Sequence, residues 1–278
     1  MARVLVVCHA YDAFRERQWL LQSMFPHWLA QGHEIRVCEG PPSATAVADI
    51  VFLHVDCSLI PEAYLEAVQR FPRVINGRVD DIRKSTLSRL RIAPEDDWQG
   101  PVIVKSALNC GGVPETWHNT RARQLGQPEP HPGARVLPSY PIYRHVSEVP
   151  PAVWTMPSIC VEKFLPDQDA RGYWTHFWLF FGDRGRCRRF CSPNPVVKAG
   201  NAVLAETVAV PASIRAERDR IGLDYGKIDF VIHGGEAIVV DVNRTPGPTP
   251  VRGGPEVGTP ELLAPGLDDL LDGPWPRW

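Results

Sequence analysis

The chain has 278 residues, of which 44% are hydrophobic and 22% are charged, a composition typical of soluble folded proteins and a length suited to two modest domains. Its 30 Lys and Arg residues against 32 Asp and Glu residues give a formal net charge of -2, which gives no reason to expect nucleic acid or an anionic membrane surface as a partner. No apolar run approaches the roughly 20 residues that a membrane helix needs, so we expect a cytoplasmic protein.

The first 78 residues alternate strands and helices in the way that is typical of a parallel sheet with helices on its faces. The patterns predict, in chain order, a strand at 2–9, a helix at 14–30, strands at 34–39 and 49–56, a helix at 61–71 and a strand at 73–77. The loop after the first strand, CHAYDAFRER, lacks the glycines that bind a dinucleotide pyrophosphate. We therefore predict a Rossmann-like scaffold domain over residues 1–78.

After residue 80 the strands are more widely spaced. The patterns predict a helix at 81–90, a strand at 100–106, a glycine-bearing turn at 108–115, strands at 158–167, 172–183, 185–193 and 206–211, a helix at 212–221 and a hairpin at 226–247. Residues 118–157 are rich in Pro, Arg and His, and they predict either a mobile lid or a long surface connection. The tail from residue 251 is rich in Gly and Pro, with a helical piece at 267–271.

The hairpin at 226–247 carries acidic residues inside apolar runs. Its turn is predicted by Gly234-Gly235, and in the resulting register Asp229 pairs near residue 240 or 241, so Asp229, Asp241 and Asn243 can converge on one patch. Two like charges repel unless a cation lies between them, and hard oxygen ligands suit Mg²⁺. We therefore predict a Mg²⁺ site; the alternative is that both carboxylates lie on a solvated face.

Lys105 ends the apolar strand at 100–106, a position that packing does not easily explain. A lysine with a buried stem carries a compact positive charge that suits a phosphate oxygen. The seven cysteines include no CxxC pair, and Cys110, in the glycine-bearing turn, is the one that we consider as a reactive thiol. No histidine can be placed beside it from the sequence, so we expect the cysteines to be structural.

The ordered set of motifs resembles the ATP-grasp superfamily of carboxylate–amine ligases. The set comprises PVIVKS with its glycine-containing loop, ICVEKFL, GKIDFV and EAIVVDVNRTPG. The resemblance spans about residues 76–250, and it lies in the order of the motifs, since none is specific alone. It implies an α/β fold with an α+β core, in which a small parallel-sheet domain (1–78) precedes a two-subdomain ATP-grasp domain (79–278). The implied parts of the second domain are a lid-like subdomain (106–165), a catalytic sheet (166–250) and the tail (251–278).

The resemblance implies which side chains bind the phosphates of ATP. Lys84 and Lys105 are assigned to the phosphates, and Lys198 lies near the place where relatives have a further cation. Gly111 and Gly112 belong to the loop that covers the triphosphate with backbone N–H groups. The alternative for Lys84 is an ordinary exposed lysine of a helix.

The resemblance also implies an adenine site in ICVEKFLPD. Glu162 would accept from the exocyclic amine, and main-chain groups near Lys163 and Leu165 would read the edge of the base. Phe164 and Leu165 would supply apolar walls. Asp169 is where the family places a ribose-binding acid, with Asp167 as a near competitor.

In the same resemblance Asp229, Asp241 and Asn243 are the ligands of Mg²⁺, and Lys227 stands where many relatives carry arginine in the catalytic site. Two positions of this chain depart from the pattern of the family. Most relatives have Glu where this chain has Asp241, which is shorter by one methylene, and a lysine at 227 keeps the charge but loses the bidentate fork of arginine. Neither departure removes a required charge, so we expect an active nucleotide site.

The implied chemistry is the activation of a carboxylate by ATP through an acyl phosphate, which an amine then attacks. We therefore expect ATP and Mg²⁺ as cofactors and a small carboxylate and an amine as substrates, and we leave a homodimer open. Arg188 and Arg189 are candidates to bind the substrate carboxylate, and strand alternation allows at most one of them to face the site. A phosphotransferase and a nucleotide-binding module without turnover remain alternatives.

Overall fold

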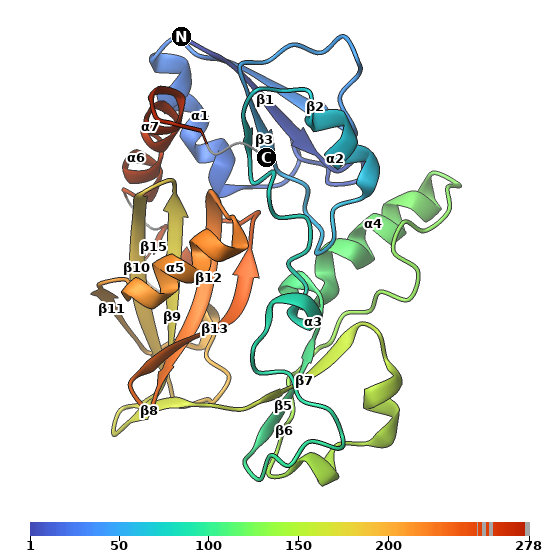
Figure 1. Cartoon of the computed structure of the whole chain (residues 1–278), viewed down its shortest axis with the longest axis vertical. Helices are drawn as coiled ribbons and strands as arrows, with labels where there is room; N and C mark the ends of the chain where they lie inside the picture. The colour runs from blue at the N-terminus through green and yellow to red at the C-terminus, as the bar shows by residue number, and fades with distance from the viewer. Residues whose placement is uncertain (249, 252–253, 256–257, 276–278) are drawn as a thin grey trace.

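The N-terminal part of the computed structural model is a four-stranded parallel sheet with a helix on each face (Figure 1). The strands lie in the order β2 (Glu34–Glu39), β1 (Arg3–Cys8), β3 (Ile50–Leu53) and β4 (Val74–Ile75). Helix α1 (Leu20–Ala30) packs on one face and α2 (Glu62–Val68) on the other. The structure describes residues 1–248, 250–251, 254–255 and 258–275.

The central strands of this sheet are continuous apolar runs because both of their faces are covered. Val4 and Val6 of β1 pack with α1, whereas Leu5 and Val7 pack with α2. Strand β3 is buried along its whole length. The parallel sheet that the alternation of strands and helices predicted is therefore present.

Two predicted helices are shorter in the structure than the sequence indicated. The helix expected over 14–30 begins at Leu20, since Ala13 has a left-handed φ of 48° and Trp19 is extended. The helix expected over 81–90 is reduced to α3 (Lys84–Leu87). Here the Asp81 carboxylate accepts from the backbone N–H of Arg83 at 2.9 Å, a local bond that competes with helix formation.

The second part of the chain centres on an antiparallel sheet of long strands. Its order is β11 (Leu204–Val208), β10 (Arg184–Ser192), β9 (Gly172–Phe181), β12 (Tyr225–His233) and β13 (Glu236–Asn243), and β8 (Asp167–Asp169) pairs with β9. Helix α5 (Ala212–Ile221) packs on one face through Ile214 and Ile221, against residues that include Trp178 and Phe230. The opposite face of the sheet is left for the candidate site.

A smaller layer lies beside this sheet, at the bottom of Figure 1. It is a three-stranded sheet in the order β6 (Ile142–Tyr143), β5 (Val102–Ser106) and β7 (Ile159–Lys163). The connections are a 3-10 turn η1 (Asn109–Gly112), helix α4 (Val113–Gln124), and the 3-10 turns η2 (Val146–Glu148) and η3 (Pro151–Thr155). Segment 118–157, for which the sequence indicated no regular structure, thus supplies half of α4 and an edge strand.

Two buried residues join the N-terminal sheet to the antiparallel sheet. Asn76, directly after β4, accepts from the backbone N–H groups of Asp224 and Tyr225 at 3.0 Å and donates to the Tyr225 carbonyl at 2.8 Å. Arg244, directly after β13, is fully buried and donates to backbone carbonyls that include those of Val79 and Ser58. These contacts fix the open ends of β12 and β13 against the N-terminal part.

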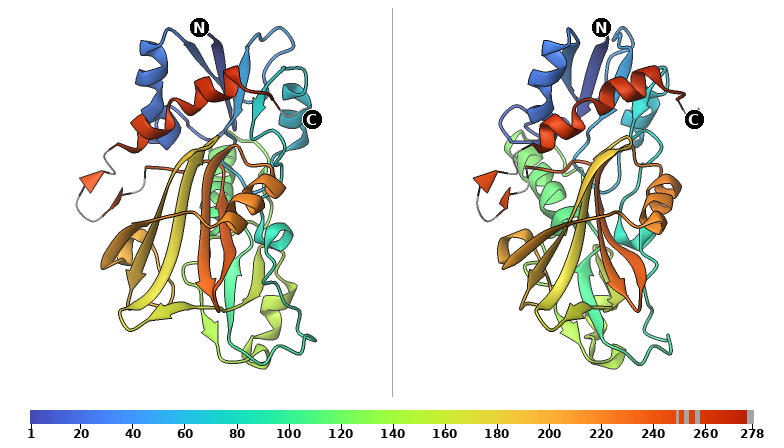
Figure 2. Two further views of the ribbon diagram at one scale, coloured as in Figure 1. Left: turned by 60° about the vertical axis from the view of Figure 1, so that its left-hand side comes forward. Right: turned by 90° about the vertical axis from the view of Figure 1, so that its left-hand side faces the viewer.

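The C-terminal helices α6 (Thr259–Leu263) and α7 (Gly266–Asp272) pack against the N-terminal sheet, as Figure 2 shows. Leu263 and Leu267 are fully buried there, and the Trp28 indole donates to the Ala264 carbonyl at 2.7 Å. The predicted helical piece at 267–271 is therefore present, but its docking on the first domain was not predicted. The remaining short elements are η4 (Ala199–Asn201), β14 (Pro250–Val251) and β15 (Gly254–Pro255). The domain boundaries given above stay predictions.

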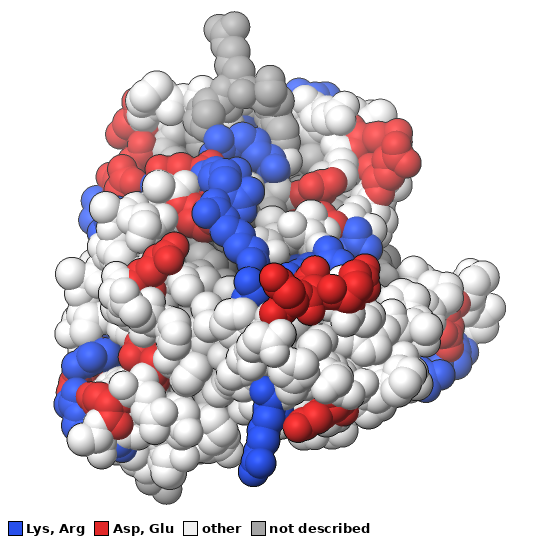
Figure 3. Space-filling model, turned by 60° about the horizontal axis from the view of Figure 1, so that its bottom comes forward, with Lys and Arg blue, Asp and Glu red and all other residues white. Residues whose placement is uncertain are grey.

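The distribution of surface charge and the length of the apolar helices agree with what the composition indicated. On the face shown in Figure 3, small groups of basic and acidic side chains are interspersed among uncharged ones. Among the described residues, no helix is both long and apolar enough to cross a membrane.

Candidate functional site

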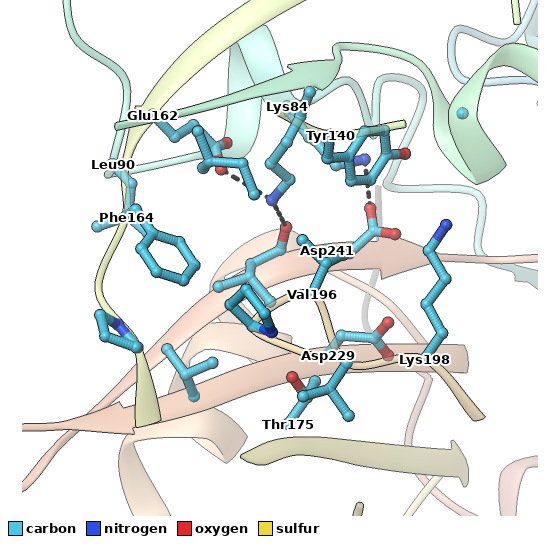
Figure 4. Close-up of a pocket in the computed structure, with 18 of the residues that line it drawn as sticks. Lys84, Leu90, Tyr140, Glu162, Phe164, Thr175, Val196, Lys198, Asp229 and Asp241 are labelled. Atoms are coloured by element: carbon cyan, nitrogen blue, oxygen red, sulfur yellow. Dashed lines mark hydrogen bonds and ion pairs between the residues drawn. The ribbon is translucent and has the colours of Figure 1, made fainter. Parts of the chain in front are cut away.

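A cavity of about 480 Å³ lies between the antiparallel sheet and the three-stranded sheet. One part of its wall is apolar, with Leu90, Ile103, Phe164, Leu165 and Val231 among its residues. Another part is charged, and Figure 4 shows side chains from both sheets pointing into it. The charged residues of the wall are Lys84, Lys105, Lys163, Lys198, Lys227, Glu162, Asp167, Asp229 and Asp241. The cavity therefore suits a ligand with an apolar or aromatic portion and an anionic portion.

The hairpin of β12 and β13 places its acidic residues side by side. Asp229 is directly opposite Asp241, one of the two residues that the sequence allowed, and Lys227 is opposite Asn243. Residues that are opposed in an antiparallel pair lie on the same face of the sheet, so all four side chains share one face. The register shifts directly after Asp229. The structure thus brings the three predicted metal ligands to the same end of the hairpin.

Each of three cavity lysines forms an ion pair with a carboxylate. Lys84 Nζ lies 2.6 Å from Asp241, and Lys227 Nζ lies 2.9 Å from Asp229. The buried Lys84 is therefore not the exposed helix lysine that the sequence allowed. Lys105 Nζ lies 2.8 Å from Glu162 and also donates to the Val240 carbonyl at 2.9 Å. These pairs compensate charges that would be costly to bury alone.

The two hairpin carboxylates differ in their proton affinity. Burial raises the pKa of Asp229 above its ordinary value; Lys227 opposes this shift, and the charge of Asp241 adds to it. Burial acts on Asp241 in the same direction, but Lys84, Lys105 and Lys227 together hold the pKa of Asp241 below its ordinary value. Asp241 is therefore the more firmly ionised of the two.

The side-chain oxygen atoms at this end of the hairpin fit a hard divalent cation. Asp229 Oδ1 is buried without a hydrogen-bond partner, and it belongs to a carboxylate opposed by a second one. Asn243 Oδ1 accepts from the backbone N–H of Thr245 at 2.8 Å and from the Asn109 amide at 3.2 Å. Two carboxylates and an amide oxygen are ligands that Mg²⁺ accepts.

The glycine-bearing turn lies at the start of α4, beside the cavity. Cys110 and Gly111 line the cavity, and the exposed Cys110 accepts a long contact of 3.7 Å from the Asn243 amide. Cys110, Gly111 and Gly112 all have left-handed φ values, of 47°, 70° and 86°. Gly112 does not line the cavity; it caps α4, whose first backbone N–H groups have no side-chain cap. An uncapped helix start favours negative charge.

The remaining predicted residues of the base and phosphate regions contact the cavity in different ways. Lys163 and Phe164 line it, but their backbone N–H groups already donate to Leu90 and Pro101 carbonyls at 2.8 and 2.9 Å. Lys198 lines the cavity, with its ammonium 5.3 Å from the centre of the Tyr140 ring.

Asp169 and Arg189 do not reach the cavity wall. Asp169 is paired with Arg171 at 2.7 Å, and Asp167 lines the cavity instead. Arg189 is paired with Glu206 at 2.5 Å. Alternation along the strand had indicated that at most one of the two arginines would face the site.

Arg188 lies on the same face of the sheet as Asp229. Both residues are opposite Phe177, on either side of β9, so the three side chains project from one face. Arg188 is two strands away from the carboxylate and is not part of the cavity wall. It is therefore the arginine that the register places on the cavity side.

Several cavity residues were not predicted from the sequence. Tyr140 comes from segment 118–157, and Trp174 and Thr175 come from β9. Asn109 and Arg244, inside the predicted motifs, fix the loop and the hairpin end rather than line the cavity. Both had a signal, since Asn109 lies inside the predicted turn at 108–115 and Arg244 lies inside NRTPG.

No protein-family model and no curated protein matches the chain. Among solved structures, D-cycloserine synthetase DcsG has a TM-score of 0.53 at 13% identity, with 96% of this chain and 99% of that chain covered. A Chryseobacterium gregarium RiPP-associated ATP-grasp ligase, in complex with ADP and a leader and core peptide, has a TM-score of 0.50 at 10% identity over 88% and 89% of the two chains. Macrocyclase MdnC from Microcystis aeruginosa MRC, bound with precursor peptide MdnA, has a TM-score of 0.50 at 9% identity over 87% and 91%. The likeness is one of fold, and it extends over most of each chain.

Proposed function

On the premise that the chain has the ATP-grasp fold, we propose that it is an ATP-dependent carboxylate–amine ligase. The observation that carries the proposal is the charged wall of the cavity, where Lys84, Lys105 and Lys227 are paired with Asp241, Glu162 and Asp229 next to an apolar region. A nucleotide triphosphate has the matching parts: an aromatic base, a chain of anionic phosphates and a bound divalent cation.

The base of ATP would lie against the apolar wall. Phe164 and Leu165 lie directly after β7, and they line the cavity together with Leu90 and Ile103. Glu162 Oε1 is buried without a hydrogen-bond partner, so it can accept from an exocyclic amine. We assign the ribose contact to Asp167, which lines the cavity, rather than to Asp169.

The phosphates of ATP would lie among the lysines. Lys105 projects from β5 of the smaller layer and Lys84 begins α3, whereas Lys198 and Lys227 come from the part of the chain that forms the antiparallel sheet. Each is a compact positive charge that can neutralise phosphate oxygen atoms. When the lysines bind phosphate, the Mg²⁺ ion bound to ATP would compensate the negative charge of the carboxylates that the lysines neutralise in this structure.

Asp229, Asp241 and Asn243 would hold Mg²⁺, in agreement with their oxygen atoms and shared face. The metal ion, when bound, supplies positive charge where the transferred phosphoryl group develops negative charge. The chain's own residues bind and orient the reactants, and the lysines stabilise charge in a partly closed cavity.

The proposed reaction has two balanced steps. A carboxylate oxygen of the substrate attacks the γ-phosphorus of ATP, and ADP leaves, which gives an acyl phosphate. An amine then attacks the acyl carbon, the amine loses a proton, and inorganic phosphate leaves with formation of a C–N bond. Arg188, on the cavity side of the sheet, is the residue that we propose to bind the substrate carboxylate, because guanidinium pairs with carboxylate bidentately.

The test is a screen of ATP consumption against a panel of small carboxylates and amines, including amino acids and short peptides. A ligase produces ADP, phosphate and a coupled product whose mass is the sum of both substrates less water. Added hydroxylamine should trap the acyl phosphate as a hydroxamate, which mass spectrometry detects. A phosphorylated product that survives hydroxylamine would instead favour a phosphotransferase, and nucleotide binding without ADP formation across the panel would favour a binding module.

A further inference from the structure

Three histidines from different segments of the chain meet outside the cavity. His9 follows β1, His118 lies in α4, and His131 lies in the connection after α4. One ring nitrogen of each histidine lies within 4.8 Å of the corresponding atoms of the other two. Within the described part of the chain, this is the one group of three or more His, Cys, Asp or Glu residues that meets this distance.

His118 is oriented by a carboxylate. Its Nε2 lies 2.7 Å from Asp12 Oδ1, and its Nδ1 lies 3.1 Å from His131 Nε2. If Nε2–H donates to Asp12, then Nδ1 of the neutral ring presents its lone pair toward His131. Histidines that bind metals commonly donate their other N–H to a carboxylate in this way, which fixes the tautomer and the ring.

The surroundings hold Asp12 and His131 in place. Asp12 Oδ2 accepts from the backbone N–H groups of His9 and Asp56 at 2.7 and 3.2 Å. The backbone of His131 is bound on both sides by the Asn119 side chain, which accepts from the His131 N–H at 2.9 Å and donates to its carbonyl at 2.7 Å. The two nitrogen atoms that face each other are therefore positioned by dedicated hydrogen bonds.

His9 is the most adaptable of the three histidines. Its ring is stacked on His118, with 3.9 Å between the ring centres. Its Nδ1 accepts from the backbone N–H of Tyr11 at 3.2 Å. Metal binding through His9 therefore requires either the loss of this hydrogen bond or a change of tautomer. We therefore expect His118 and His131 to contribute more to metal affinity than His9.

Buried carboxyl groups lie around the three histidines. Asp12, Asp56 and Glu115 are buried around the histidines, and Glu115 Oε2 has no hydrogen-bond partner. The basic side chains near this group include Arg17, which lies 3.2 Å from Asp56, and the buried Arg244.

We propose that His118, His131 and His9 bind a divalent transition-metal ion of the Zn²⁺ class, separate from the Mg²⁺ site of the hairpin. Imidazole ligands select such ions over Mg²⁺. Three histidines leave a further coordination position open for water or a substrate group. The metal ion ties α4 and the connection after it to the loop that follows β1.

The experiment uses the full chain after removal of metals with EDTA, in buffer with excess Mg²⁺ to saturate the hairpin site. Co²⁺ is titrated and its visible ligand-field absorption recorded, and Zn²⁺ is titrated by calorimetry. We expect one strong site per chain, with affinity reduced at least 10-fold in His131→Gln and about 10- to 100-fold in Asp12→Asn. His145→Gln, on the smaller layer, and Asp241→Asn, in the hairpin, should bind Co²⁺ and Zn²⁺ like the wild type.

Circular dichroism and thermal unfolding establish that each variant is folded, and His9→Asn replaces any variant that is not. The proposal is overturned if no ligand-field bands appear, or if Co²⁺ affinity is the same in His131→Gln and the wild type; the histidines are then a hydrogen-bonded packing cluster. Loss of Co²⁺ binding in Asp241→Asn alone would also overturn it, because the ion would then lie in the hairpin site.

Discussion

The lysines of the cavity are the residues whose charge and position best fit a bound nucleotide. Lys105 is buried, and its ammonium is shared between Glu162 and the Val240 carbonyl. A buried lysine in this position requires a compensating anion, and the phosphate of a nucleotide could replace the carboxylate. The sequence indicated this lysine because it ends an apolar strand.

Replacement of Lys105 should weaken nucleotide binding. We expect Lys105→Met to lower the affinity for Mg-ATP about 10-fold or more, since a charged hydrogen-bond partner is lost, and Cys110→Ala to change it less than about 2-fold. Calorimetric titration measures both. Because the single change leaves Glu162 buried without a cation, the double variant with Glu162→Gln serves as the control for folding. Equal losses in Lys105→Met and Cys110→Ala would contradict the assignment of Lys105.

Asp241 should be required for turnover but not for folding. Asn is nearly isosteric with Asp, so we expect Asp241→Asn to fold, while the ATP-dependent rate falls about 100-fold or more and requires higher Mg²⁺. The rate of the accepted substrate pair across a Mg²⁺ titration measures this. A normal rate with unchanged Mg²⁺ dependence would mean that Asp241 is a strand carboxylate with no part in metal binding.

At the scale of elements, local signals predicted the hairpin and long-range contacts decided the rest. The Gly234-Gly235 turn sets the register from His233 to Phe230, and a register shift between Phe230 and Asp229 then brings Asp241 opposite Asp229. The helix expected over 212–221 has those bounds in the structure. The predicted start of α1 was wrong because nothing in the sequence indicates the left-handed backbone conformation of Ala13. His118 and His131 were missed because the contact with His9 joins segments more than 100 residues apart, which no local pattern encodes.

The turn before α4 should tolerate alanine at Gly112 poorly. A Cβ there would lie 2.5 Å from the Arg135 carbonyl oxygen, in addition to the strain of a φ of 86°. We expect Gly112→Ala to lower the free energy of unfolding by about 2 to 4 kcal/mol. The matched control is Gly126→Ala, with a φ of 66° and nothing within 4 Å, which should cost about 1 kcal/mol. Urea unfolding of both variants measures the difference, and equal costs would contradict the close approach to Arg135.

At the scale of the whole molecule, the two ends of the chain stabilise one layer. Helices α6 and α7 pack on the sheet that begins with β1, and the Trp28 indole bonds to the Ala264 carbonyl. The same cluster includes Leu179 and Phe181 from β9. The tail therefore joins the N-terminal sheet to the antiparallel sheet, and composition alone could not reveal this because glycine and proline dominate the tail.

Leu267 should be a large contributor to stability. Its side chain is fully buried, so we expect Leu267→Ala to lower the free energy of unfolding by about 2 to 5 kcal/mol. Leu125→Ala, at a position that is 63% exposed, should change it by no more than about 0.5 kcal/mol. Thermal or urea unfolding distinguishes the two variants. A cost at Leu267 as small as that at Leu125 would mean that α7 is not docked.

The measurement that tests the central claim most directly is calorimetric titration of the wild-type chain with ATP, with and without Mg²⁺, alongside thermal unfolding under the same conditions. We expect one nucleotide per chain, tighter binding with Mg²⁺, and a higher melting temperature, because a ligand that binds only the folded state stabilises it. In Asp241→Asn the gain in affinity from Mg²⁺ should shrink. If millimolar Mg-ATP produces neither heat of binding nor a shift in melting temperature, the cavity is not a nucleotide site and the proposed ligase activity is wrong.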